Sequence, residues 1–227
     1  MLSYYRLNYK FLNGYLSFAI KQREVSSLSD YRAIADVGET LIELLRDNME
    51  DLVDRESIVL YSPGEIDPSD NARLSLFLYQ VLENTHLRNQ EMQVKDQDTL
   101  IFPPLTLELY YMLTSHTSSG VQDKTARSLE EHTVLGRAAR VLYDHSVLKG
   151  SLLKGNLNKN EELHIMMSSL NMEDLTKIWS TFPSKPFRPS ICYVVTPVQI
   201  NSGREVGVQR VISREINYSY YSRKGGK

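Results

Sequence analysis

The sequence predicts an α/β (α+β) fold in which helices pack on a single-layer sheet that is mainly antiparallel or mixed. Three observations support this: some stretches place apolar residues every three or four positions, others alternate apolar and polar residues, and the two kinds are interleaved. With 227 residues, the chain is long enough for one large domain with a substantial core and tails. We expect the helices to cover one face of the sheet.

The first helix is expected from residue 31 onward. Its apolar residues recur at three- and four-residue steps, and charged residues that include Asp36 occupy the opposite face. Ser29 or Asp30 is the expected N-cap, because a short polar side chain can accept a hydrogen bond from the free backbone N–H groups. The apolar face consists of Ile34, Val37, Leu41, Leu44, Leu45 and Met49.

Two more helices follow. The second is expected over residues 127–143, and the third is short and begins after Asn171, which is suited to cap it. Prolines exclude a helix beyond the third and impose an extended passage. They are Pro183, Pro186 and Pro189, and the apolar face before them consists of Leu175, Ile178, Trp179 and Phe182.

Alternation predicts the strands. Pro197 has no N–H group to donate, so it predicts a sheet edge, a bulge or a strand break at that point. Residues 84–100 are polar and show no periodic pattern, which predicts a long connection, and glycines at 150 and 155 mark a turn. Strands are expected at 58–61, 73–82, 105–111 and 163–167, and as a pair within 191–200 that is broken near Pro197.

The composition excludes several classes of protein. Hydrophobic residues make up 41% and charged residues 24%, as in ordinary globular proteins, so the chain as a whole is not intrinsically disordered. Cys192 is the only cysteine, which excludes an internal disulfide and a cysteine-based zinc site. No stretch approaches the roughly 18 apolar residues of a membrane-spanning helix. The apolar run at 11–20 is interrupted and precedes charged residues, unlike a signal peptide, so the cytosol is the expected compartment.

Charge is unevenly distributed along the chain. The overall charge is −2, but residues 1–28 carry +3, residues 204–227 carry +4, and the segment between them is strongly acidic. Seven of the fourteen tyrosines lie in these two basic ends. Arg and Tyr are enriched at protein interfaces, so the ends are candidate binding segments. They are equally compatible with solvated tails, or with tails that fold back on the acidic body.

No catalytic motif emerges, and the sequence predicts that the protein is not an enzyme. The five histidines are not spaced as metal ligands, and residues 150–155 resemble a phosphate-binding loop but lack the Lys-Ser/Thr that must follow. Cys192 lies in an expected core strand, where a thiol is usually inert. Asp144 and His145 form a possible acid–base pair, although a histidine at a helix C-terminus also favours the helix dipole. We therefore expect no catalytic, cofactor or metal site.

Several segments together resemble the cap, or tail-terminator, proteins of extracellular contractile injection systems, the antifeeding prophage and Photorhabdus virulence cassette type. The resemblance covers roughly residues 28–212. No single segment is specific, because each is a core pattern; their combination and order carry the resemblance. The segments are 28–38, 62–66, 74–79, 103–105, 109–113, 131–132, 135–136 and 179–190.

The resemblance implies a tail-terminator-like core at 29–203, an N-terminal extension at 1–28 and a basic, Tyr-rich C-terminal arm at 204–227. It implies a structural protein that forms a hexameric ring. The ring would end the inner tube and the contractile sheath of a phage-tail-like particle, distal to the baseplate. The implied partners are other copies of the chain, the sheath protein and the inner tube protein, without nucleic acid, membrane or small molecule. The protein would be cytoplasmic during assembly and then part of the particle.

The C-terminal arm is the expected partner-binding segment. Its β-branched residues suit addition as a strand to a sheet of the sheath or of a neighbouring subunit, although it can also be the last strand of its own domain. The candidate partner-binding residues are Arg204, Val206, Val208, Arg210, Val211, Arg214, Tyr218, Tyr220 and Tyr221.

Other functions stay open. The closest alternative is the terminator of a contractile phage tail. A different class is a soluble enzyme whose site is assembled from scattered residues such as Asp144, His145 and Arg188. A third is a nucleic-acid adaptor, but the sequence has no recognisable binding module, and the acidic middle segment would repel phosphates.

Overall fold

A computed structural model describes residues 31–208, apart from residues 68, 97, 118, 119, 121, 158 and 159. The main feature is a six-stranded sheet with the strand order β1-β2-β5-β8-β7-β6. Neighbouring strands are antiparallel except for β1 and β2, which are parallel, so the predicted mixed sheet is confirmed. The strands are β1 (Ile58–Val59), β2 (Leu74–Glu83), β5 (Leu105–Ser115), β6 (Val147–Lys149), β7 (Glu162–Ser168) and β8 (Ser190–Ile200).

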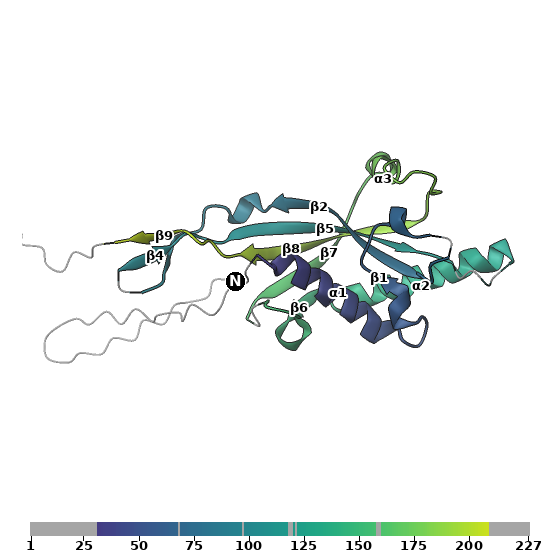
Figure 1. Ribbon diagram of the computed structural model, residues 1–227, viewed down its shortest axis with the longest axis horizontal. Helices are drawn as coiled ribbons and strands as arrows, with labels where there is room; N and C mark the ends of the chain where they lie inside the picture. The colour runs from purple at the N-terminus through teal and green to yellow at the C-terminus, as the bar shows by residue number, and fades with distance from the viewer. Residues whose placement is uncertain are drawn as a thin grey trace, which may run out of the picture.

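Helices α1 (Ala33–Met49) and α2 (Lys124–Asp144) lie on the same face of this sheet (Figure 1). Their apolar residues form one large cluster with alternate residues of the strands, as the period of two requires. Val37 and Leu45 are fully buried against this face, as are Leu109 and Val195 from the two central strands. The predicted helices and core strands are therefore confirmed.

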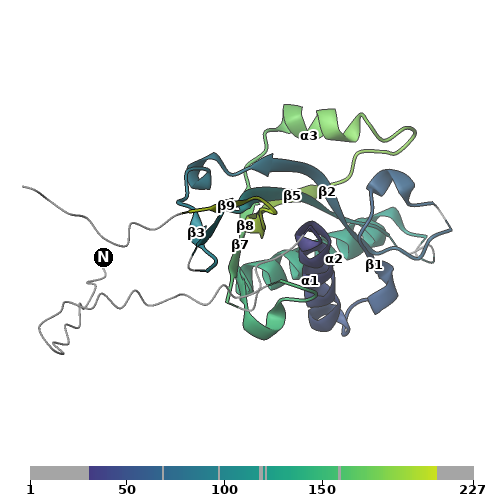
Figure 2. The same ribbon diagram turned by 60° about the vertical axis from the view of Figure 1, so that its left-hand side comes forward.

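Helix α3 (Met172–Trp179) covers the opposite face of the sheet (Figure 2). Asn171 caps it as predicted, because its side-chain oxygen accepts a hydrogen bond from the N–H group of Asp174 at 2.8 Å. Trp179 packs on the other set of alternating strand residues, represented by Met112 and Cys192. The expectation that the helices cover one face is therefore wrong, because the third helix closes a smaller second core.

The beginning of α1 differs from its prediction in two ways. The helix starts after Arg32, which occupies the N-cap position and makes no capping bond to the free N–H groups of the helix. Ser29 and Asp30, predicted as the cap, lie outside the described residues. Asp36, assigned to the polar face, is only 1% exposed. Its carboxylate accepts a hydrogen bond from the N–H group of Asn156 at 2.9 Å, so a loop far along the chain buries it.

The connection after β2 is more ordered than its composition predicts. It contains a short 3₁₀ helix η3 (Thr85–Leu87) and strands β3 (Gln93–Val94) and β4 (Thr99–Ile101). Together with β9 (Glu205–Gly207), these strands form a separate antiparallel sheet of order β3-β4-β9, hereafter the small sheet. It lies at one end of the described structure, beyond the main sheet (Figure 1). Strands of two or three residues are too short for their alternation to be recognised in sequence.

Strand β8 is continuous, so the expected strand pair within 191–200 is wrong. Its register with β5 shifts between Leu107 and Leu109, which pair with Val198 and Val195. Pro197 lies in this irregularity, in agreement with the bulge that was one of the three positions predicted for it.

The remaining short elements are the 3₁₀ helices η1 (Arg55–Ser57), η2 (Pro63–Glu65) and η4 (Gly150–Leu152).

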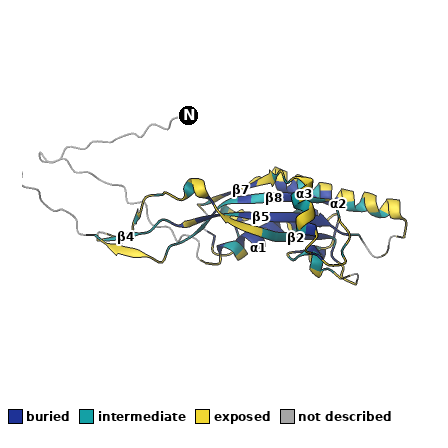
Figure 3. Ribbon diagram, turned by 90° about the horizontal axis from the view of Figure 1, so that it is seen from above, coloured by how far each residue is buried: buried dark blue, intermediate teal, exposed yellow. Residues whose placement is uncertain are grey.

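Burial is greatest in the central strands and least at the two ends (Figure 3). Strands β5 and β8 carry most of the buried strand residues, whereas the small sheet and the first half of α2 are largely exposed. Within the described residues, no helix combines the length and the apolar character that crossing a bilayer requires.

Candidate assembly interface

The structure describes three of the nine candidate partner-binding residues. Arg204, Val206 and Val208 lie in or beside strand β9 of the small sheet. The other six fall outside the described residues, and their role stays a prediction. They are Arg210, Val211, Arg214, Tyr218, Tyr220 and Tyr221.

Strand β9 pairs with β4 of its own chain. Hydrogen bonds extend the pairing on both sides of the strand: the N–H group of Phe102 donates to the oxygen of Arg204 at 3.0 Å, and that of Val208 donates to Asp98 at 2.8 Å. The arm therefore begins as a strand of its own domain. Strand β9 is at the edge of the small sheet, so its outer edge pairs with no strand of the described residues.

One face of the small sheet is apolar. Val94, Leu100 and Val206 form a row across its three strands, because Leu100 pairs with both valines. Val94 is 45% exposed and Val206 is 38% exposed, so this row is not buried by the described part of the chain. By the alternation of a strand, Phe102 and Arg204 lie on the same face. The guanidinium carbon of Arg204 lies 4.1 Å from the centre of the Phe102 ring, a cation–π contact.

The opposite face of the small sheet is polar. The ammonium group of Lys95 donates to the carboxylate of Glu205, an ion pair that joins β9 to the β3–β4 connection. This hydrogen bond raises the pKa of Lys95. An exposed ion pair of this kind stabilises a fold only slightly. The small sheet is thus two-sided, with an apolar face suited to packing against protein.

Sequence analysis missed the β3 and β4 residues of this face. The only signal was the short apolar run at residues 100–102 within a polar segment. Such a run does not reveal its partner strand, which lies about 100 residues further along the chain.

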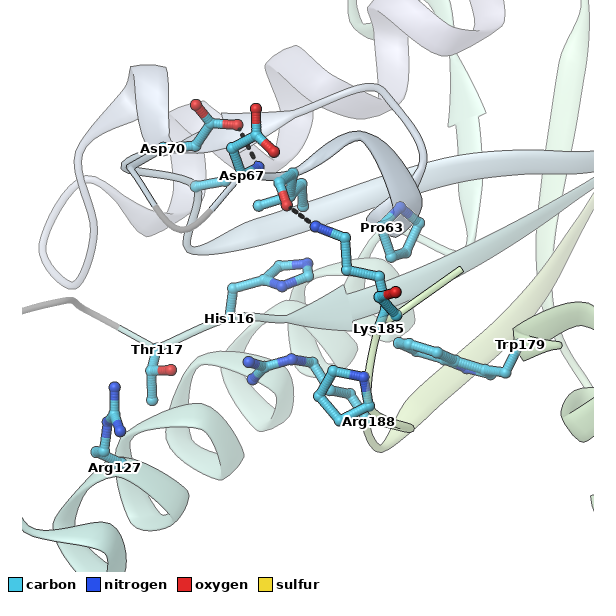
Figure 4. A pocket seen from close by; sticks show the side chains of 13 residues that line it. Pro63, Asp67, Asp70, His116, Thr117, Arg127, Trp179, Lys185 and Arg188 are labelled. Carbon is cyan, nitrogen blue, oxygen red and sulfur yellow. Dashed lines mark hydrogen bonds between the residues drawn. The ribbon is translucent and has the colours of Figure 1, made fainter. Parts of the chain in front are cut away.

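A pocket lies at the other end of the main sheet (Figure 4). It has a volume of about 380 Å³ and is formed by the loop after β1, the end of β5, the start of α2 and the segment between α3 and β8. Positively charged side chains dominate the segment before β8: Lys185 donates to the oxygen of Ile66, and Arg188 pairs with the carboxylate of Glu131. These cations are used to join elements of the fold.

His116 lines this pocket and bonds to a serine that sequence analysis did not pair with it. The distance from its Nε2 atom to Oγ of Ser75 is 2.8 Å. Burial, together with the positive charges of Arg188 and Lys185, lowers the pKa of His116 to about 4, so the ring is neutral at pH 7. A Ser–His contact can activate a nucleophile, but Ser75 is fully buried and out of reach of a substrate. The pair is therefore a structural contact.

The scattered residues named for an enzyme site are not brought together. His145 bonds through Nδ1 to the oxygen of Val141, and Asp144 pairs with Arg140 on the surface. Arg188 binds Glu131, and α2 rises by about 20 Å between Glu131 and Asp144. Across residues 31–208, as far as they are described, no group of three or more His, Cys, Asp and Glu side chains is arranged to hold a metal ion.

Two solved structures share this fold. One is the sheath/tube terminator of PVC, an extracellular contractile injection system, in its extended state: the TM-score is 0.59 and the identity 16%, over 85% of this chain and 65% of the matched chain. The other is the tube terminating cap of the anti-feeding prophage, with a TM-score of 0.53 and 17% identity, over 81% of this chain and 61% of the matched one. The present chain thus spans less than two thirds of the length of either.

No protein of curated function matches the sequence. The model of one protein family does, the Pvc16 N-terminal domain, over residues 36–214. This match includes α1 from its fourth residue onward, all three strands of the small sheet and both central strands of the main sheet. The chain therefore belongs to the Pvc16 N-terminal domain family.

Proposed function

We propose that the protein is a terminator, or cap, of a contractile injection system. It would form a hexameric ring on the inner tube and the contractile sheath of a phage-tail-like particle, at the end distal to the baseplate. The observation that carries the proposal is the agreement of one family match with two structural matches, a sheath/tube terminator and a tube terminating cap.

The physical task of a terminator explains why a ring is expected. A tube or sheath grows because each subunit offers the same surface to the next one. A heterologous contact that closes on itself leaves no repeating end on which growth can continue. A protein with this task needs extended surfaces for contact with its neighbours, and it needs no catalytic site.

The charge distribution supports contacts between neighbouring subunits. Residues 209–227 contain five Arg and Lys residues and one Glu, whereas the middle of the chain is acidic. The arm beyond Val208 would reach an acidic neighbour, either another copy or the sheath protein. Arg210, Val211, Arg214, Tyr218, Tyr220 and Tyr221 are the residues proposed for this contact.

The protein would assemble in the cytoplasm and leave the cell, if at all, as part of a particle. We propose no enzymatic activity. This is supported by the fully buried serine beside His116 and by the separation of Asp144 from Arg188. The terminator of a contractile phage tail is the second candidate, since it would perform the same task on a similar polymer.

Electron microscopy of particles made with and without this gene tests the proposal. With the gene, we expect tubes and sheaths of uniform length that end in a six-fold ring. Without it, we expect irregular lengths and open ends. Complementation with the Arg140→Gln variant, altered at an exposed body residue, is the matched control and should restore uniform particles. Uniform, closed particles in the absence of the gene would contradict the proposal, and a DNA-filled head on the capped tail would favour the phage alternative.

A further inference from the structure

The two outermost strands of the main sheet cover only part of their neighbours. Strand β1 pairs with β2 at Leu74 and Ser75, and β6 pairs with β7 at residues 162–164. The later residues of β2 and of β7 therefore have no strand of the described residues on their outer sides. Strands β2 and β7 lie on opposite sides of the central strands β5 and β8 (Figure 1). Such an open edge offers unpaired N–H and C=O groups to another chain.

Backbone hydrogen bonds show which residues point outward at each open edge. The N–H group of Asn84 donates across to β5 at 2.8 Å, and the pairing of residues 80–83 with β5 has no register shift. Since successive residues of a strand turn their N–H groups to opposite sides, the N–H group of Val81 points away from the sheet. On β7, the N–H group of Ile165 donates outward to the chain before β6 at 2.8 Å. The N–H group of Met167, two residues later, points to the same side.

Both open edges carry exposed apolar side chains. Val81 and Leu82 are 40% and 43% exposed on β2, and Met166 and Met167 are 48% and 64% exposed on β7. Val81 and Met167 each pair with a residue of the main core cluster, so both lie on the face that α1 and α2 cover. Their neighbours Leu82 and Met166 lie on the face that α3 covers. Each edge thus offers one apolar side chain on each face.

The two edges are also compatible in direction. Strands β2, β5, β8 and β7 are each antiparallel to the next, so β2 runs antiparallel to β7. When a second copy is placed beside the first with its faces in the same orientation, its β7 meets β2 as an antiparallel partner. With Val81 opposite Met167, Leu82 comes opposite Met166. This register brings apolar side chains together on both faces and lets two outward N–H groups bond across the contact.

We propose that β2 of one copy pairs with β7 of the next copy, with Val81 opposite Met167, and so joins the main sheets of neighbouring subunits. This inference rests on the ring of the proposed function and names the contact that builds it. The contact is heterologous because the two edges differ, so it can repeat around a ring and close. Main-chain hydrogen bonds supply affinity and the paired side chains define the register, as in other cases of strand addition.

Two proline variants of the full-length chain test the pairing. Val81→Pro and Met167→Pro each remove one outward N–H group that makes no bond within the chain's own main sheet, and edge strands tolerate such prolines. We expect each variant alone to be monomeric by native mass spectrometry. A mixture of the two should form 1:1 pairs, because the first keeps an intact β7 edge and the second an intact β2 edge. Such pairs would also show that both variants fold. Val81→Ile keeps the N–H group and an apolar side chain, and as the matched control it should form rings like the unchanged chain.

The outcomes separate this inference from the proposed function. Rings formed by either proline variant alone, or a mixture that stays monomeric, would overturn the pairing and leave the terminator proposal standing. An unchanged chain that stays monomeric would overturn both the pairing and the proposed ring.

Hydrogen exchange of the unchanged chain gives a second measurement that needs no variant. On assembly, we expect exchange at the amides of Val81 and Met167 to slow by about tenfold or more, because a bonded amide exchanges only when the pairing opens. The amides of Leu82 and Met166 point into the main sheet and should change by less than about twofold. Equal exchange rates at Val81 and Met167 in the monomer and in the ring would overturn the pairing.

Discussion

A Cβ atom placed on Gly155 would lie 2.4 Å from Cγ of Asp36. The two residues are separated by more than a hundred positions, yet the turn that contains Gly155 lies directly on the buried carboxylate. The next N–H group of that turn, from Asn156, donates to Oδ2 of Asp36 at 2.9 Å. The start of α1 is thus held by a loop from the second half of the chain, and the contact leaves no room for a side chain at position 155.

Gly155→Ala should destabilise the protein by about 2–4 kcal/mol. Gly155 has φ of +63°, which costs an alanine about 1 kcal/mol, and the steric clash with Asp36 adds about 1–3 kcal/mol. Gly150→Ala is the matched control, because Gly150 has φ of +62° but no atom within 4 Å of the added carbon. Urea unfolding of both variants gives the comparison. Equal losses of stability would show that the contact with Asp36 contributes nothing beyond backbone conformation.

Stability should fall as the pH decreases from about 6.5 to 4, in part because of His116. Its pKa is about 4 in the folded protein and about 6.5 when unfolded, so the unfolded state binds more protons in this interval. The contribution is complete above pH 6.5 and amounts to at most about 3 kcal/mol. His116→Gln, which can still bond to Ser75, should show a shallower decline in urea unfolding measured from pH 7.5 to 4.5. Parallel curves for the two proteins would contradict the assignment.

Trp179→Ala should cost about 3–5 kcal/mol, since it empties the centre of the second core. The indole is 5% exposed, and its ring lies 5.4 Å from that of Phe182, edge to face. Phe187→Ala is the control: its ring also contacts Trp179 but is 46% exposed, so its loss should cost only about 1 kcal/mol. Circular dichroism is the suitable probe, because Trp179 is the only tryptophan. A loss below about 1 kcal/mol for Trp179→Ala would mean that α3 contributes little to the fold.

Ring formation should weaken when the salt concentration is raised, if the basic arm binds acidic neighbours. Exposed charge pairs contribute about 0.2–1 kcal/mol each and are screened by salt, and a ring repeats them at every contact. A chain that ends at Val208 keeps β9 and its pairing with β4, so its fold should persist while its ring assembly becomes weaker and less sensitive to salt. Analytical ultracentrifugation at low and high salt measures both effects. Rings of unchanged stability in the shortened chain would remove the arm from the interface.

The elements predicted correctly are those whose periodic pattern extends over many consecutive residues of one segment. The first two helices and the strands at 73–82 and 105–111 each contain several periods of alternating or helical spacing, and the structure contains them all. The cap of α3 was predictable because a single side chain, Asn171, creates it. The whole family resemblance likewise depended on the order of several core segments.

The features that could not be predicted depend on contacts between distant residues. Asp36 looks like a surface residue until a loop 120 positions away supplies an N–H group. The small sheet requires β9 to meet β4, and neither strand has enough residues to show a period. For the same reason, the second face covered by α3 was missed: alternation identifies one apolar face of a strand, but it does not show that a helix also covers the other face.

The register shifts of the main sheet affect the direction in which the small sheet extends from the rest of the molecule. Both strands that flank β5 gain one residue relative to it: β2 shifts opposite Tyr110 and Tyr111, and β8 shifts near Leu107. Such shifts bend a strand and increase its twist. Because the two shifts lie close together along β5, they place a bend between the packed body and the small sheet at its end. Removal of one extra residue would change the direction of the small sheet relative to the body, so the two register shifts set the angle between these parts.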